Sequence, residues 1–109
     1  SLNSEGSYNE EGFEEGPWKF YYDTSQVMGS EGNYEDGRRV GVWSYYHHNG
    51  TLKERGEFFM NDAVGLWKEY YSNGILSGEG EYSRWGTKTG IWKYYDEKGQ
   101  LVKEKDFGK

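Results

Sequence analysis

Two adjacent histidines, His47 and His48, are the side chains of this sequence best suited to metal binding or proton transfer. If they lie on a strand, they point to opposite faces of a sheet, so they cannot easily bind the same metal ion. Two neighbouring histidines also do not supply the serine, histidine and acid of a nucleophilic triad. The pair is therefore more typical of polar residues near a turn than of a catalytic site or a metal site.

Other candidates for chemistry are equally weak. The carboxylates recur with a regular spacing instead of gathering in one pair, which does not predict a general acid and base. The run Gly78-Glu79-Gly80-Glu81 lacks the third glycine and the helix of a dinucleotide-binding loop. The sequence contains no cysteine, which excludes a disulfide, a thiolate metal site and a cysteine nucleophile. We therefore predict no enzymatic activity, no cofactor and no bound metal.

A repeat of 24 or 25 residues organises the chain instead. Each unit has a glycine two residues before a tryptophan, a tyrosine three residues after it, and a G-x-aromatic element further on. The repeat positions that we expect to be structural are Trp18, Trp43, Trp67, Trp92, Gly41, Gly65, Gly90, Gly56 and Gly80. We divide the single domain, residues 1–109, into units at about 6–40, 41–64, 65–89 and 90–107. The first unit is expected to begin with an acidic cap strand.

Each unit is predicted to form two short strands. An aromatic-rich stretch runs into Asn49-Gly50 or Asn73-Gly74, a dipeptide that favours two-residue type I′ turns. Such a turn joins only antiparallel strands. The predicted fold is therefore all-β, a single-layer antiparallel meander of stacked hairpins with eight or nine strands, elongated and twisted. One extra residue in the first unit predicts a longer turn or a bulge around residues 24–26.

Counting outward from the turn gives cross-strand partners, namely Leu52 with His47, Gly56 with Trp43 and, in the next unit, Gly80 with Trp67. A glycine opposite an indole leaves room for the ring to lie across the neighbouring strand. Alternation then places the indoles on one face of the sheet, and charged residues with a row of tyrosines on the other. A single-layer sheet leaves the indole face without a covering layer. This predicts either strong curvature or a second chain, such as another copy of this protein, that covers the face.

The charge of the chain is uneven. The net charge is −6, but residues 1–16 contain five glutamates and no basic residue, so the remainder carries 14 acidic and 13 basic residues. No basic stripe is present, which makes nucleic acid an unfavourable partner. A polybasic cluster is also missing, which argues against a membrane surface. The sequence contains no run of 18 apolar residues that would predict a transmembrane helix.

The segment from Tyr34 to Tyr46, followed by Asn49-Gly50-Thr51-Leu52 and Gly56-Glu57-Phe58, resembles the MORN repeat. It is most similar to the bacterial variant with the pattern Y-x-x-G-x-x-x-G-x-W-x-x-Y, then N-G-x-L, then E-G-x-Y. The resemblance covers nearly all of residues 6–107. It implies stacked hairpins used for binding rather than catalysis, in a bacterial protein. The compartment stays open between the cytoplasm and export with the signal removed. Many bacterial members carry an antitoxin label of the YwqK type.

Two departures from the repeat pattern stand out. Ala63, with Asp62 before it, is aligned with glycines of the other units, namely Gly12, Gly37 and Gly86. Lys103 and Lys105 take the place of two glycines in the last unit, which is typical of an end unit.

The leading functional hypothesis is a non-enzymatic module that binds another protein through a sheet face or an edge strand, with an antitoxin or immunity protein as a specific version. Tyrosines on a rigid ladder, screening lysines and the N-terminal glutamates are the candidate contact residues. They are Tyr21, Tyr46, Tyr70, Tyr95, Lys19, Lys68, Lys93, Glu10, Glu11, Glu14 and Glu15. Carbohydrate or cell-wall binding through the aromatic rings is the alternative, and phospholipid association is a second one.

Overall fold

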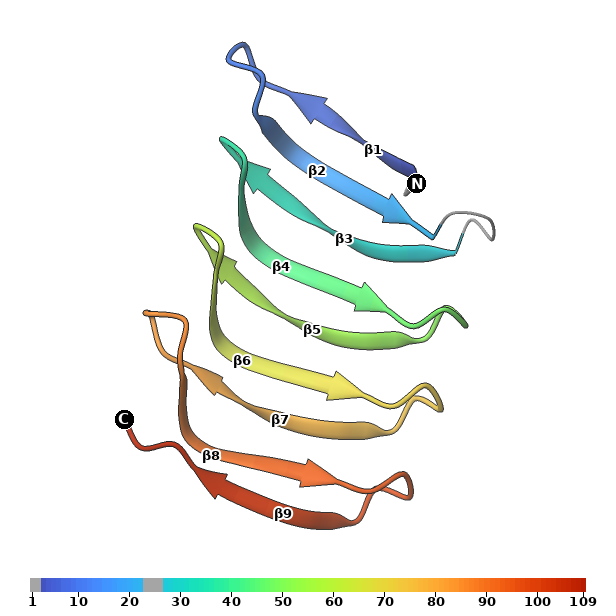
Figure 1. The fold of residues 1–109 in the computed structure, drawn as a ribbon, viewed down its shortest axis with the longest axis vertical. Coiled ribbons are helices and arrows are strands. Elements are labelled where there is room, and N and C mark those ends of the chain that lie inside the picture. The colour runs from blue at the N-terminus through green and yellow to red at the C-terminus, as the bar shows by residue number, and fades with distance from the viewer. Residues whose placement is uncertain (1–2, 23–26) are drawn as a thin grey trace.

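The computed structural model describes residues 3–22 and 27–109, and these residues form one antiparallel sheet of nine strands. The strands follow one another in chain order across the sheet, so every strand pairs with its sequence neighbours (Figure 1). They are β1 (Asn3–Tyr8), β2 (Glu14–Tyr21), β3 (Met28–Glu35), β4 (Arg38–Tyr46), β5 (Leu52–Phe59), β6 (Asp62–Tyr70), β7 (Leu76–Tyr82), β8 (Lys88–Tyr95) and β9 (Leu101–Asp106). The predicted meander of hairpins is confirmed.

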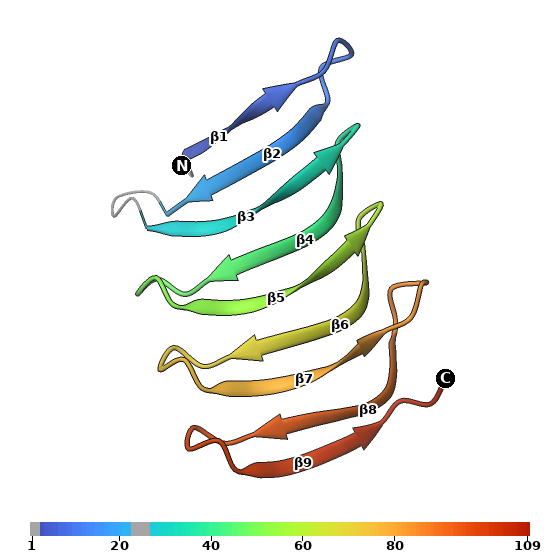
Figure 2. The same ribbon diagram turned by 180° about the vertical axis from the view of Figure 1, so that it is seen from behind.

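The sheet is a slab that measures 47 × 35 × 16 Å, and no second layer covers either face within the described residues (Figures 1 and 2). The even-numbered strands β2, β4, β6 and β8 bend sharply near their first residues (Figure 1). Gly41, in the first half of β4, has a φ of 72° and open space where a β-carbon would lie. Glycine is needed there because a side chain is strained at positive φ, and not because of crowding.

The turns differ from the prediction. Gly50 has a φ of 89°, but Asn49 does not have a positive φ, and Gly50 N–H donates to the His47 carbonyl. The loop is therefore a three-residue type I turn closed by a glycine, followed by a bulge in the pairing. The longer loop places His47 opposite Thr51 and Leu52 opposite Tyr46, so the predicted partner His47 was wrong. The bulge then restores the predicted register from Tyr45 with Glu54 onward.

Two-residue turns with positive φ at both central residues occur at the other ends of the strands, where β3 joins β4 and β5 joins β6. They contain Asp36 with Gly37 and Met60 with Asn61. Asn61, not Ala63, therefore takes the place of the glycine in its unit, and asparagine is the side chain that best tolerates this conformation. The longer turn expected in the first unit falls on residues 23–26, which lie outside the described residues.

The predicted pairs Gly56 with Trp43 and Gly80 with Trp67 are confirmed in the register of β4 with β5 and of β6 with β7. The ring that lies over each glycine, however, comes from the tryptophan of the following strand. Trp67 covers Gly56, and its indole N–H donates to the Glu57 carbonyl at 3.1 Å. The four equivalent pairs are Trp18 over Gly6, Trp43 over Gly32, Trp67 over Gly56 and Trp92 over Gly80.

We call the side of the sheet that carries Trp18, Trp43, Trp67 and Trp92 the indole face. Its rings bury one another, and Trp43 and Trp92 are only 1% and 0% exposed. Phenylalanine and tyrosine rings from the neighbouring strands meet the indoles edge-on, at centroid distances of 5.1–6.4 Å. Cations add a partial cover, with Arg39 over the Phe58 ring and Lys88 over the Trp92 ring. The face therefore buries its own tryptophans, and a second copy that covers it stays a prediction.

Candidate binding face

The opposite side of the sheet is organised in three rows of side chains, and we call it the tyrosine face. An aliphatic row comes from the residues directly before each tryptophan, and a tyrosine row comes from the ends of the same strands. Between them runs a charged row in which each residue is the cross-strand partner of the next. The aliphatic row is Pro17, Val42, Leu66 and Ile91; the tyrosine row is Tyr21, Tyr46, Tyr70 and Tyr95. The charged row is Glu5, Lys19, Glu31, Ser44, Arg55, Lys68, Glu79, Lys93 and Glu104.

The aliphatic row is the main apolar surface that this face leaves open. Val42, Leu66 and Ile91 are 50%, 54% and 55% exposed, although each directly precedes a buried indole. The reason is alternation along the strand, which turns neighbouring side chains to opposite faces. A continuous exposed apolar row, which can mark a binding site, therefore lies on the tyrosine face.

Three shallow hollows follow one another along the tyrosine face, with volumes of about 240, 320 and 470 Å³. Each contains one of the glycines that an indole covers from the other side, and each lies where the register of two strands shifts at a bulge. Successive members of the aliphatic row border them, so that Val42 and Leu66 each belong to two hollows.

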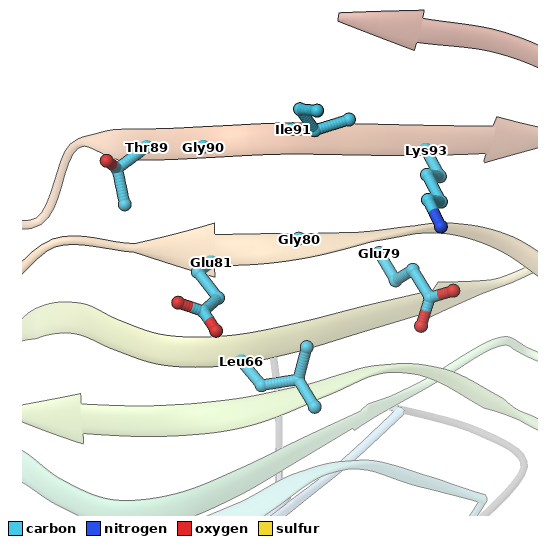
Figure 3. A pocket seen from close by; sticks show the side chains of 8 residues that line it. All are labelled: Leu66, Glu79, Gly80, Glu81, Thr89, Gly90, Ile91 and Lys93. Atoms are coloured by element: carbon cyan, nitrogen blue, oxygen red, sulfur yellow. The ribbon is translucent and has the colours of Figure 1, made fainter. Parts of the chain in front are cut away.

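The largest hollow lies between β6, β7 and β8 (Figure 3). Leu66 and Ile91 border it, and Gly80 lies between them on β7. The side chains of Glu79 and Glu81 extend from β7 toward β6, and Lys93 extends from β8 toward β7 (Figure 3). An acidic and a basic lining around an apolar border suits a polar ligand with an apolar part, and no catalytic arrangement is present among these residues.

The members of the tyrosine row do not contact one another. They lie on every second strand, about 9–10 Å apart, which is too far for ring contact. Three of them instead donate a hydrogen bond to a glutamate of the preceding strand: Tyr21 to Glu5 at 2.9 Å, Tyr46 to Glu31 at 2.7 Å and Tyr95 to Glu79 at 2.8 Å. The hydrogen bonds to Glu5 and Glu79 are the main causes that raise the pKa of Tyr21 and of Tyr95. For Tyr46, burial raises the pKa most, followed by the bond to Glu31.

Tyr70 is the exception in this row. The residue of β5 that takes the place of the glutamate is Arg55, and its cross-strand partner on β6 is Lys68. Within the described chain, the Tyr70 hydroxyl makes no hydrogen bond. The three side chains also border the middle hollow, together with Val42 and Leu66. Lys19 and Lys93, by contrast, each pair across the strands with two glutamates.

The same pair of strands is unusual on the indole face. Glu54 of β5 and Glu69 of β6 are cross-strand partners, so the expectation that no two carboxylates gather was wrong. Glu69 takes the position that an aromatic residue holds in the other units. Burial, and then repulsion from Glu69, raises the pKa of Glu54. Among the described residues, no group of three or more metal-ligating side chains includes this pair.

The acidic N-terminal residues are not confined to a cap strand. Strand β1 carries only Glu5, while Glu10 and Glu11 lie in the following loop and Glu14 and Glu15 begin β2. A Glu15 carboxylate oxygen accepts a hydrogen bond from the Asp36 amide at 3.1 Å. Part of this acidic segment therefore supports the neighbouring turn, and only part is free to meet a partner.

The two histidines serve to join repeats. His47 Nε2 lies 2.8 Å from the Tyr70 carbonyl, and the His48 ring stacks on Tyr22 at a centroid distance of 3.8 Å. The Tyr22 hydroxyl donates to the Tyr46 carbonyl, and the Tyr71 hydroxyl donates to the Tyr95 carbonyl, which are the equivalent contacts of other units. His47 therefore takes the place of a tyrosine that links one hairpin to the next.

The repeat pattern predicted the tyrosines and lysines of this face as contact residues, but it did not predict Arg55. Aligning the residue before each glycine of the G-x-aromatic element, and its lysine counterpart in the last unit, would have found it. This position occurs five times along the chain, four times as a glutamate (Glu5, Glu31, Glu79 and Glu104) and once as Arg55. A consensus pattern averaged over all units hides such a charge reversal, because it occurs in one unit alone.

Comparison with known proteins identifies the repeat. A sequence model described as the MORN repeat variant matches residues 14–36, 39–59, 63–84 and 88–108. No curated protein matches the chain at a significant level. The described residues contain no helix that could cross a membrane.

Solved structures share the fold at low sequence identity. A crystal structure of the S. aureus TarM G117R mutant in complex with fondaparinux, alpha-GlcNAc-glycerol and UDP aligns over 96% of this chain, with 12% identity and a TM-score of 0.57. A second TarM crystal structure aligns over 94% of the chain, with 12% identity and a TM-score of 0.53. The chain spans 20% and 19% of the length of those two proteins, so the likeness concerns the sheet alone.

Proposed function

Because this chain belongs to the MORN repeat variant family, we propose that it is a non-catalytic module that binds another protein through its tyrosine face. MORN repeats generally act as protein-interaction or membrane-interaction modules, and as a rule they are not catalytic. The proposal selects one of these two partner classes and one of the two faces.

The observation that carries this proposal is the difference in burial of apolar side chains between the two faces. The indole face buries its tryptophans inside the chain, whereas the aliphatic row of the tyrosine face stays about half exposed beside three hollows. Exposed apolar side chains rimmed by tyrosines and charged residues are the usual composition of a protein interface. The long axis of the slab, 47 Å, offers room for an interface of ordinary size.

A protein fits this face better than a membrane does. The chain carries a net charge of −6, and glutamates alternate with the basic residues of the charged row. An anionic bilayer would be repelled by these carboxylates, because membrane binding gains about 1 kcal/mol only for each basic residue near the surface. Four of the five tryptophans are buried, so Trp85, at 72% exposed, is the one indole that is open for a glycan to stack on.

Site-specific crosslinking tests the proposal. A photo-reactive benzoylphenylalanine replaces Leu66 on the tyrosine face or, as the control, Trp85 in a loop, and each variant is irradiated in cells of the source organism. We expect the variant at position 66 to capture a defined protein, and Val42→Asp in the same chain to abolish that capture without changing the circular dichroism. Capture only from position 85, or capture that Val42→Asp leaves unchanged, would contradict the proposal.

The resemblance to antitoxin-like members suggests a more specific version, in which the partner is a toxic protein that this chain neutralises. Co-expression with the product of the adjacent reading frame tests it. Rescue of growth by the native chain, and loss of that rescue with Leu66→Asp, is the expected result. If the chain gives no protection, the antitoxin version is wrong. The crosslinking result still tests whether a protein binds the tyrosine face.

A further inference from the structure

In the charged row of the tyrosine face, acidic and basic residues alternate except at the centre of the sheet. At both ends of the sheet, acidic and basic residues alternate from strand to strand: Glu5, Lys19 and Glu31 at one end and Lys68, Glu79, Lys93 and Glu104 at the other. At the centre, Ser44 is followed by Arg55 and Lys68, which are direct cross-strand partners. Like charges opposite each other destabilise a sheet, so folding alone does not favour this pair.

The same place lacks the hydrogen bond that the other units make. Tyr21, Tyr46 and Tyr95 each donate to a glutamate carboxylate, but Arg55 occupies that position next to Tyr70. The described chain therefore contains a Tyr70 hydroxyl, an Arg55 guanidinium and a Lys68 ammonium without a hydrogen-bonded carboxylate among them. All three are donors, and what is missing from the repeat is their acceptor.

The middle hollow places these donors beside an apolar surface. Its volume is about 320 Å³, with Val42 and Leu66 on its border and Gly56 in its lining. Glu57 also lines the hollow. If a ligand placed one carboxylate against Arg55 and Lys68, Glu57 would repel a further carboxylate of that ligand. The geometry thus suits one carboxylate, carried on a side chain next to an apolar residue.

Resting on the proposed function, we infer that Arg55, Lys68 and Tyr70 form a subsite that binds one acidic side chain of an extended partner segment, in place of the glutamate missing from this repeat. Charge complementarity selects this occupant. Arg55 and Lys68 have only one glutamate, Glu79, as a cross-strand partner between them, and this excess of one positive charge matches a single carboxylate and not an anionic surface. A guanidinium and an ammonium together also provide strong charge-assisted hydrogen bonds.

The spacing of the hollows agrees with an extended segment that crosses the strands. Hollows recur every second strand, which is about 9–10 Å. Three residues of an extended or polyproline II chain cover about the same distance. Every third side chain of such a segment would therefore reach a hollow, with the acidic one in the middle and apolar ones on either side.

A peptide titration tests this subsite. The probe is a nine-residue, proline-rich peptide labelled with fluorescein, with glutamate at its fifth position and leucine at its second and eighth. Binding to the full chain is followed by anisotropy and by the amide shifts of the ¹⁵N-labelled protein. The comparison peptides carry glutamine or lysine at the fifth position, and vesicles of phosphatidylserine in phosphatidylcholine form a separate arm.

Arg55→Glu is the decisive variant, because glutamate is the natural residue at this position in the other units. Lys98→Glu, in the exposed turn before β9 and outside the three hollows, is the matched control with an equal change in net charge. We expect Arg55→Glu to weaken binding of the glutamate peptide at least tenfold and Lys98→Glu to weaken it less than threefold. We expect the glutamine peptide to bind at least fivefold more weakly than the glutamate peptide. We expect the native chain not to bind the phosphatidylserine vesicles.

Four results would overturn the inference. They are no binding of the glutamate peptide, equal weakening by both variants, equal binding of the glutamine peptide, and vesicle binding that Arg55→Glu abolishes. Each of them is separate from the crosslinking at position 66, which would still report a protein on the tyrosine face. A failure of the subsite is therefore distinguishable from a failure of the proposed function.

Discussion

The indole ring of Trp67 lies directly over the α-carbon of Gly56, and a β-carbon at that glycine would overlap the ring. The indole N–H reaches past the glycine to the carbonyl of Glu57, which fixes the ring in this position. Each pair of this kind joins an even-numbered strand to the strand before it. The repeat is therefore held together across the boundary between hairpins and not only within a hairpin.

Gly56→Ala is expected to destabilise the protein by about 3 kcal/mol, because the added methyl group must displace a buried indole. Urea unfolding followed by circular dichroism measures the change. Gly29→Ala is the matched control, since a β-carbon there would make only ordinary contacts, at 3.5 Å or more, and its cost should stay below about 1 kcal/mol. If both variants lose the same stability, the contact between Gly56 and Trp67 is not the cause.

The double variant Gly56→Ala with Trp67→Leu extends this test. A smaller side chain over the alanine relieves the overlap, so the combined loss of stability should be less than the sum of the two single losses. Strict additivity would show that the two residues do not interact as the structure places them.

Glu54→Gln should stabilise the protein at neutral pH. Burial, then repulsion by Glu69, raises the pKa of Glu54 above its usual value, so the folded state disfavours the carboxylate that exists at pH 7. The unfolded chain ionises more readily, and the penalty disappears as the pH falls through the raised pKa toward about 4. Thermal unfolding at pH 7 and pH 4 checks this, with Glu97→Gln in an exposed turn as the control. A gain that is equal at both pH values would contradict the assignment.

Met60→Asn should raise the free energy of unfolding by about 0.5–1 kcal/mol. Met60 has a φ of 48° in a two-residue turn, a conformation in which asparagine is favoured and most other side chains are strained. Asp36 holds the equivalent position in the preceding turn. Chemical unfolding of the variant and the native chain gives the difference, and a loss of stability would show that the Met60 side chain contributes packing that outweighs the strain.

Trp85→Phe should remove most of the tryptophan fluorescence that iodide can quench. Trp85 is 72% exposed, whereas the four repeat tryptophans are at most 5% exposed. The emission that remains should be shifted to shorter wavelength, because the remaining indoles lie away from water. Strong quenching in the variant would mean that the indole face is open in solution and would favour a second copy that covers it.

The tandem spacing of the tryptophans and glycines was enough to predict the meander, a number of eight or nine strands and the common face of the tryptophans. This was possible because neighbouring hairpins contact only each other, so a local pattern repeated in phase specifies the whole sheet. The pairs Gly56 with Trp43 and Gly80 with Trp67 followed from counting along two antiparallel strands.

Features that depend on contacts between repeats were not available from such counting. The sequence could not show that each indole covers the glycine of the preceding strand, because that choice depends on how one hairpin twists against the next. For the same reason it could not show that the tryptophans bury themselves. The turn at Asn49-Gly50 was also mispredicted, since the dipeptide fits both a two-residue turn and the final residues of a three-residue turn.

The amino-acid sequence by itself determined the repeat, the sheet and the absence of a recognisable catalytic motif, because alternation and turn chemistry act over a few residues. Only the tertiary structure decided which face remains open, and it alone brought Arg55, Lys68 and Tyr70 to one hollow and Glu54 beside Glu69. Those residues come from separate strands, and the cross-strand register that unites them is set by bulges whose positions emerge only when the hairpins pack side by side.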